Sequence, residues 1–281
     1  MRTLALIAYL VGALTGWSAE RPEVRTGTVL RVDPARHRLV IEETPGSAPV
    51  DYFARPGDLE LPWAGRRIRY EVLLDGERRW ADTIFPAGAE ELRRVAEVTD
   101  ALRRQTADQG RLVTRMPRDL IPDLALWDQD ARLVFKKDLL GAPFALNFIF
   151  TSCRSAKMCP ASTTCMKQLG DALAKEPRLS GVRLVTITFD PEVDSPGLLR
   201  TYAQGYGIDQ VRHRFLTGDP GQIKDLMRNF GILTVRDDGT IVHNAALLVI
   251  NAQGRIAQRR EGASFDAAEV AQVLAGLALE R

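Results

Sequence analysis

An apolar run followed at once by two thiols constrains the fold of this chain most tightly. Residues Ala145–Thr151 are almost all apolar, as expected of a strand covered on both faces of a sheet. Cys153 and Cys159 come next, and Pro160 suits the first turn of a helix. The sequence therefore predicts a strand, a loop with two cysteines and a helix in immediate succession.

The amino terminus has the pattern of an export sequence. After Met1 and Arg2, Thr3 to Ala19 form a run of about 17 uncharged residues without a cysteine, which excludes a lipoprotein anchor. Residues 1–19 are predicted to be a signal peptide cleaved near Ala19 or an uncleaved membrane anchor. We expect an exported protein that is periplasmic or membrane-anchored facing the periplasm, where thiols are oxidised unless they are kept reduced or hold a metal.

The cysteine count argues against a complete disulfide framework. The chain has 3 cysteines, an odd number for an exported protein. Cys165 lies further along the predicted helix, about 240° around its axis from Cys159. We predict a small buried core residue at Cys165, with a third ligand or a resolving thiol as the alternative.

The length and the charge of the chain limit the classes of function that it can have. With 281 residues and 45% hydrophobic content, the chain can bury one sizeable core and a smaller module. Its 38 basic and 36 acidic side chains are spread along the sequence and leave a formal net charge of +2. This distribution lacks the basic footprint of nucleic-acid binding, so a protein or a metal ion is the expected partner.

Two smaller units precede the cysteine loop. Residues 22–86 alternate apolar and polar side chains between turns, which predicts a small all-β barrel with a loop between Pro45 and Pro62. Residues 87–115 carry apolar side chains at helical spacing as far as Gly110, which predicts an amphipathic helical connector. The same stripe could instead form a dimer interface or pack against the barrel.

Residues 116–281 alternate strands and helices around the cysteine loop. A hairpin, Leu124–Trp127 with Arg132–Phe135, is predicted first. After the loop and its helix, the sequence predicts a strand over 182–189, helices over 196–206 and from Asp219, a terminal hairpin over 244–258 and a helix over 265–277. This is the order of a thioredoxin-like α/β domain, here with an additional amino-terminal hairpin.

Four motifs in this domain resemble the Sco/SenC family. They are Asn147 to Pro160 with its two cysteines, Phe189 to Pro196, Leu216 to Pro220, and His243 to Gly254. The resemblance, over roughly residues 117–279, implies a thioredoxin-like copper protein that helps to assemble the CuA centre of cytochrome c oxidase. It assigns Cu(I) or Cu(II) to Cys153, Cys159 and His243. The commonest family spacing places three residues between the cysteines, whereas Arg154 to Met158 make five here.

The barrel bears a fainter resemblance to a CusF-like periplasmic copper module. The ligands of that module are histidine and methionine, and neither residue occurs between Glu42 and Pro62. We therefore assign no metal to the barrel.

The residue types at the cysteine loop suit copper on chemical grounds as well. Thiolates favour Cu(I), and imidazole binds both Cu(I) and Cu(II), so two cysteines and a histidine can hold copper through a redox change. Arg154 and Lys157 are expected to favour the thiolate form of their neighbours, with plain surface charge as the alternative.

The remaining candidates are histidines and one aspartate. His243 precedes an apolar strand near one end of the predicted sheet, which together with the resemblance favours a ligand. His37 and His213 lie among arginines and are predicted to be surface residues. Asp190 follows a buried strand, and we expect it either to accept a hydrogen bond beside the thiols or to cap the following turn.

Two functions remain open from the sequence. A non-enzymatic copper chaperone needs Cys153, Cys159 and His243 together, whereas a thiol-disulfide oxidoreductase needs only the two cysteines as a redox-active pair. Thiol exchange usually employs two intervening residues, so the longer loop favours copper. Expected partners are a cytochrome c oxidase subunit or another cuproprotein, together with a thiol reductase or an upstream copper donor.

Overall fold

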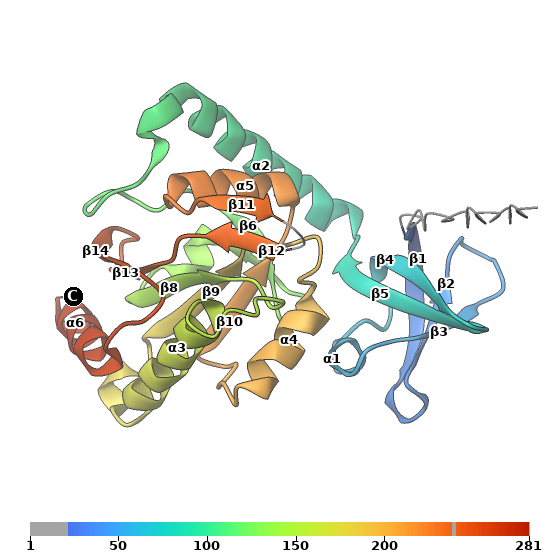
Figure 1. Ribbon diagram of the computed structural model, residues 1–281. Coiled ribbons are helices and arrows are strands. Elements are labelled where there is room, and N and C mark those ends of the chain that lie inside the picture. Colours follow the sequence, from blue (N-terminus) through green and yellow to red (C-terminus); the bar gives the residue numbers. More distant parts are fainter. Residues whose placement is uncertain (1–21, 238–239, 281) are drawn as a thin grey trace, which may run out of the picture.

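The computed structural model describes residues 22–237 and 240–280 and consists of a small barrel, a long helix and an α/β domain (Figure 1). The signal peptide or membrane anchor predicted for residues 1–19 lies outside the described residues. Among the helices of the described part, none combines the length and apolarity that crossing a bilayer requires.

Five strands close into the barrel in the order β1-β2-β3-β5-β4. They are β1 (Glu23–Asp33), β2 (Arg38–Glu42), β3 (Val50–Phe53), β4 (Arg67–Asp75) and β5 (Arg78–Pro86). The barrel closes because β1 pairs with β4 as well as with β2. Tyr52, Trp63 and Tyr70 are fully buried inside it, which confirms the predicted all-β barrel.

The loop predicted between Pro45 and Pro62 is wrong in part, because β3 and the short helix α1 (Pro56–Leu59) lie there. β3 bridges β2 and β5, and Tyr52 points into the barrel core. The strand is only four residues long and lies between Pro49 and Pro56, which gave the whole segment the composition of a loop.

Helix α2 (Ala89–Gln109) is the predicted connector, and it ends at Gly110, whose φ is 54°. Its buried side chains include Thr99 and Thr106, which accept hydrogen bonds from Gln222 at 2.6 Å and Asn229 at 2.9 Å. Both donors belong to the α/β domain, so the buried face of the helix packs against that domain.

The α/β domain has a seven-stranded sheet in the order β14-β13-β8-β9-β10-β6-β7. Its strands are β6 (Ala125–Asp128), β7 (Leu133–Phe135), β8 (Phe144–Ile149), β9 (Arg183–Thr188), β10 (His213–Thr217), β13 (Ala246–Ile250) and β14 (Ile256–Glu261). The helices are α3 (Cys159–Ala174), α4 (Pro196–Gly205), α5 (Pro220–Asn229) and α6 (Ala267–Leu279). Short 3-10 turns are η1 (Pro34–Arg36), η2 (Gly110–Val113), η3 (Lys136–Leu139) and η4 (Pro177–Leu179).

This architecture confirms the thioredoxin-like fold with its additional hairpin, β6–β7. Strands β8, β9 and β10 run parallel, and β13 is antiparallel to β8. Helices α3 and α6 cover one face of the sheet, and α5 with α2 covers the other (Figure 1). The cysteine loop follows β8 at the carboxyl end of the parallel strands, where ligand sites of open α/β sheets lie.

A separate hairpin stands between α5 and β13, and the sequence analysis did not predict it. It consists of β11 (Thr234–Asp237) and β12 (Thr240–His243), and among the described strands these two pair only with each other. Thr234 pairs with His243 at its base, so the predicted histidine ligand is carried by this hairpin.

The barrel contacts the α/β domain through α1 and α4 at very short range. A methyl group on Gly197 would lie 2.1 Å from Oδ1 and 2.9 Å from the backbone nitrogen of Asp58, and one on Gly57 would lie 2.1 Å from the carbonyl oxygen of Gly197. Glycine at both positions therefore permits the close approach of the two backbones. Arg200 strengthens the contact through an ion pair with Glu60 at 2.8 Å.

Candidate metal centre

The two predicted cysteines lie at either end of the loop between β8 and α3. Cys153 is half-buried and packs against the main core cluster, while Cys159 is the first residue of α3 and only 1% exposed. Pro160 occupies the first turn of that helix, as predicted. All three cysteines of the chain are free thiols in the structure.

His243 reaches the thiols from the hairpin. Its ring packs against Phe150 and Phe189, with ring centroids 5.8 Å and 4.6 Å away, and the two phenylalanines also contact each other at 5.2 Å. Nδ1 lies 2.7 Å from the backbone carbonyl of Asn244. A carbonyl only accepts, so Nδ1 carries the proton and Nε2 keeps its lone pair. Nε2 in turn lies 3.5 Å from Sγ of Cys159.

These three residues form a cluster suited to one metal ion. The two Sγ atoms and one imidazole nitrogen all lie within 4.8 Å of one another. Sulfur ligands of an ion such as zinc lie about 2.3 Å from it, so two of them are at most about 4.6 Å apart. Shifts of a few tenths of an ångström would therefore bring all three atoms into coordination distance. Two sulfurs and an imidazole are a soft donor set, which favours Cu(I) among biological metals.

Burial governs the protonation of the cluster. It raises the pKa of the Cys159 thiol well above its usual range, and the neighbouring Cys153 adds to this rise. Arg154 and Lys157 are exposed, so the expectation that they favour a thiolate is wrong for Cys159. Burial likewise lowers the pKa of His243, and the hydrogen bond to the Asn244 carbonyl opposes this effect. The ring is thereby kept neutral, the form in which imidazole binds metals.

Asp190 contacts the hairpin that carries His243, through Arg236. Its carboxylate accepts a hydrogen bond from Arg236 of β11 at 2.8 Å, and Arg236 also pairs with Glu192 at 3.0 Å. Its backbone carbonyl accepts hydrogen bonds from Val193 and Asp194 in the following turn. No hydrogen bond joins the Asp190 side chain to a thiol or to His243 within the described chain. Asp190 therefore ties the hairpin to the loop after β9.

Asp194 is a supporting residue that the sequence analysis missed. It is 1% exposed, and its carboxylate accepts hydrogen bonds from the hydroxyl of Thr188 and from both the hydroxyl and the backbone N–H of Thr151. Burial outweighs these bonds and raises its pKa to about 6. Thr151 opens the cysteine loop, so Asp194 fixes where that loop begins. The sequence offered one signal for Asp194, namely its position inside the Phe189 to Pro196 motif.

The other candidates lie away from the cluster. His37 is exposed, as predicted. His213 was predicted to be a surface residue and is instead 2% exposed in β10, where Nε2 lies 2.7 Å from the hydroxyl of Thr186. Cys165 is half-buried rather than a buried core residue, and it does not belong to the three-residue cluster.

The fold and the cluster define a class of protein: a thioredoxin-like domain in which two thiols and an imidazole replace a closely spaced dithiol. Residues 113–279 match the SCO1/SenC family model. The chain belongs to the SCO1/SenC family.

Known relatives agree with this membership. The SCO1 protein homolog of Bacillus subtilis is 27% identical over 139 residues, which cover 48% of this chain and 70% of the relative. The structure of BsSco, described as a member of the Sco family of cytochrome c oxidase assembly proteins, covers 59% of this chain and 98% of its own at 22% identity and a TM-score of 0.52. Copper-bound ScoI of Arabidopsis thaliana covers 58% of this chain and 100% of its own at 20% identity and a TM-score of 0.50. The two structures demonstrate the shared fold.

Proposed function

We propose that this protein binds one copper ion through Cys153, Cys159 and His243 and delivers it during the assembly of cytochrome c oxidase, at the CuA site. The observation that carries the proposal is the convergence of the three ligand atoms within 4.8 Å. Membership of the family supports it, because a relative with this fold was solved with copper bound and BsSco is described as a cytochrome c oxidase assembly protein.

The three proposed ligands differ in their exposure to solvent, which suits a bound copper ion that must be released again. Cys159 is buried, whereas His243 and Cys153 are half-buried and Cys153 lies at the start of an exposed loop. Copper would enter and leave on the side of the two half-buried ligands. Because thiols bind metals as thiolates, loading releases protons.

The first test is a competition titration of the reduced protein lacking residues 1–19 against a Cu(I) chelator. Cys153→Ser and His243→Ala should each weaken binding by about tenfold or more. Cys165→Ser and His37→Ala are matched controls outside the cluster and should bind copper as the wild type does. If His243→Ala binds Cu(I) as tightly as the wild type, the proposed ligand set is wrong.

Thiol-disulfide exchange is the second candidate function. It is favoured by the proximity of two free thiols, one of them partly accessible. Exchange needs no imidazole ligand, so reduction of a disulfide substrate should survive His243→Ala and be lost in Cys153→Ser. Weak Cu(I) binding together with this activity pattern would make exchange the leading function.

We also propose that the protein is exported, with residues 1–19 as the signal or anchor. The supporting feature is the uncharged run after Arg2. A fusion of residues 1–30 to alkaline phosphatase, an enzyme active only after export, should be active in bacterial cells. An inactive fusion would contradict export.

A further inference from the structure

A groove of about 390 Å³ runs beside the candidate metal centre. Its apolar lining includes Phe189, Ile223, Met227 and Ile232, and Phe189 packs against the ring of His243 at 4.6 Å between centroids. A single side chain, that of Phe189, thus separates the groove from a proposed ligand. A protein that exchanges copper with this site must approach within contact distance of the same ligand.

Exposed apolar side chains lie in the groove and on the hairpin beside it. Leu233 lines the groove and is 72% exposed. Val235 and Val242, 63% and 55% exposed, pair on the face of the hairpin opposite to that of Thr234 and Arg236, which line the groove. Scattered exposed apolar residues are common, but large exposed apolar side chains next to a functional site are typical of a protein interface.

The charges around the groove are predominantly basic. Lys224, Arg228 and Arg236 line it, and Glu192, its acidic lining residue, pairs with Arg236 at 3.0 Å. Arg154 and Lys157 lie exposed on the cysteine loop. Among the described residues, Arg154, Lys157 and Lys224 form no ion pair with an acidic side chain. This surface is therefore complementary to an acidic partner.

We propose that this surface, the docking groove, binds the copper-accepting protein through an apolar patch with an acidic rim. The proposal rests on the proposed copper-delivery function and adds the face and the chemistry by which the acceptor is recognised. Apolar contact supplies the affinity, while the unpaired basic residues steer the acceptor onto the metal centre.

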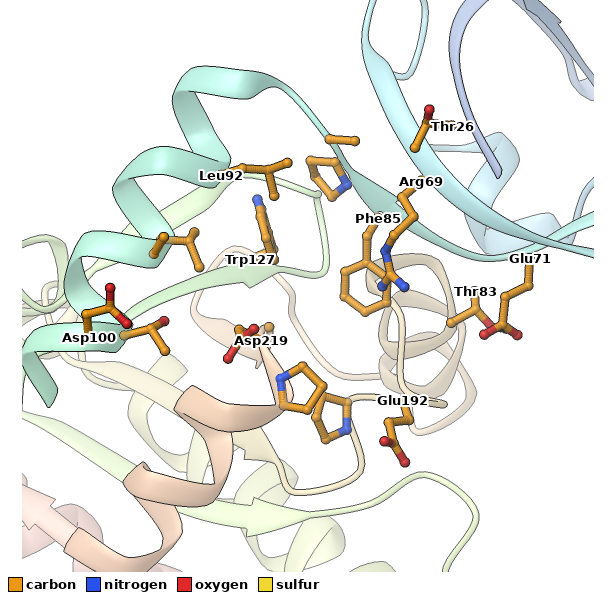
Figure 2. A pocket seen from close by; sticks show the side chains of 18 of the residues that line it. Thr26, Arg69, Glu71, Thr83, Phe85, Leu92, Asp100, Trp127, Glu192 and Asp219 are labelled. Carbon is orange, nitrogen blue, oxygen red and sulfur yellow. Dashed lines mark hydrogen bonds between the residues drawn. The ribbon is translucent and has the colours of Figure 1, made fainter. Parts of the chain in front are cut away.

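The docking groove continues into a larger cleft. Pro191, Glu192 and Pro220 line both the groove and a cleft of about 750 Å³ between the barrel and the α/β domain. Figure 2 shows Arg69 and Phe85 of the barrel in this cleft, together with Trp127 and Asp219 of the α/β domain. An acceptor segment that leaves the metal centre along the groove would therefore reach the barrel.

The test measures docking without copper. The full chain, reduced, copper-free and ¹⁵N-labelled, is titrated at low ionic strength with the purified copper-free CuA domain of a bacterial cytochrome c oxidase. Lys224→Glu and Leu233→Ser alter exposed groove residues, and Arg79→Glu reverses an exposed charge on the barrel outside the groove. Cu(I) affinity of each variant is measured separately by competition titration.

The expected result is a set of amide shift changes at residues 224–236 and about tenfold weaker docking in Lys224→Glu and Leu233→Ser, with Arg79→Glu within about twofold of the wild type. Salt should weaken wild-type docking. Shift changes confined to other surfaces, no docking by the wild type, or equal docking by all variants would overturn the proposal. The outcomes are separable: a wild-type protein that binds Cu(I) tightly but does not dock refutes only this inference, whereas a wild-type protein that docks but does not bind Cu(I) refutes the delivery function.

Discussion

The carboxyl group of Asp58 should make the stability of this protein depend on pH, and Asp58→Asn should remove that dependence. The side chain lies 1% exposed at the contact between α1 and α4, and its Oδ1 has no hydrogen-bond partner in the described part of the chain. Burial, reinforced by the charge of Asp82, raises its pKa to about 8, and Arg55 only partly opposes the rise.

The sign and size of the effect follow from linkage between protonation and folding. The folded protein holds the Asp58 proton more tightly than the unfolded chain, whose value is 3.8. Stability is therefore greatest below the unfolded pKa and falls as pH rises toward the folded pKa. At 1.36 kcal/mol per unit, a rise from 3.8 to about 8 corresponds to about 6 kcal/mol, of which about 3 to 4 kcal/mol falls between pH 5 and pH 8.

Urea unfolding at pH 5 and pH 8 measures this difference directly. From pH 5 to pH 8 the free energy of unfolding should decrease in both proteins, and the decrease should be about 3 to 4 kcal/mol smaller in Asp58→Asn than in the wild type. Asp75→Asn, at the exposed end of β4, is the matched control and should follow the wild type. Other titrating groups such as Asp194 contribute equally to all three proteins and cancel. Parallel pH profiles for Asp58→Asn and the wild type would refute the reasoning.

Three further perturbations test separate features. Gly197→Ala should lower the free energy of unfolding by about 1–3 kcal/mol because its methyl group would meet the α1 backbone. Gly205→Ala in the same helix is the control, because its methyl group would have no atom within 4 Å. If both variants lower the free energy of urea unfolding equally, the close contact at Gly197 is wrong. Pulsed alkylation with mass spectrometry should label half-buried Cys153 about tenfold faster than Cys159, which is 1% exposed, and equal rates would contradict that burial. Burial lowers the pKa of His213 to about 3, so the wild type should lose stability as pH falls below the unfolded value of 6.5, and His213→Gln should show a shallower loss in acid unfolding.

The local pattern of the sequence was sufficient for most of the α/β domain. The apolar run before Cys153 and the proline after Cys159 predicted β8, the loop and the start of α3, because these signals depend on neighbours in sequence. The same reasoning failed at His213. Its arginine neighbours suggested a surface position, but alternate residues of a strand face opposite sides, and in β10 this places the histidine inside.

Features that depend on distant segments could not be read from the sequence. The contact between Gly57 and Gly197 exists only once the barrel and α4 meet, and Asp58 resembles any turn aspartate until that contact buries it. At the candidate site, the resemblance to the Sco/SenC family, and not a local pattern, grouped His243 with the two distant thiols, and the three side chains lie together in the fold. The protonation of Cys159 was misjudged because burial, a property of the folded chain, outweighs nearby charges in sequence.

Because β11 and β12 pair only with each other among the described strands, the local stability of their hairpin differs from the global stability of the fold. His243 is held by a hairpin outside the seven-stranded sheet. We expect opening of this hairpin to cost less free energy than global unfolding, and local opening of this kind escapes a global unfolding measurement. A substitution at Arg236 could therefore leave the melting temperature unchanged and still reduce the fraction of molecules in which the imidazole faces the thiols. The apparent affinity for a metal falls in proportion to that fraction. Measuring metal affinity would therefore detect an opened hairpin that calorimetry does not detect.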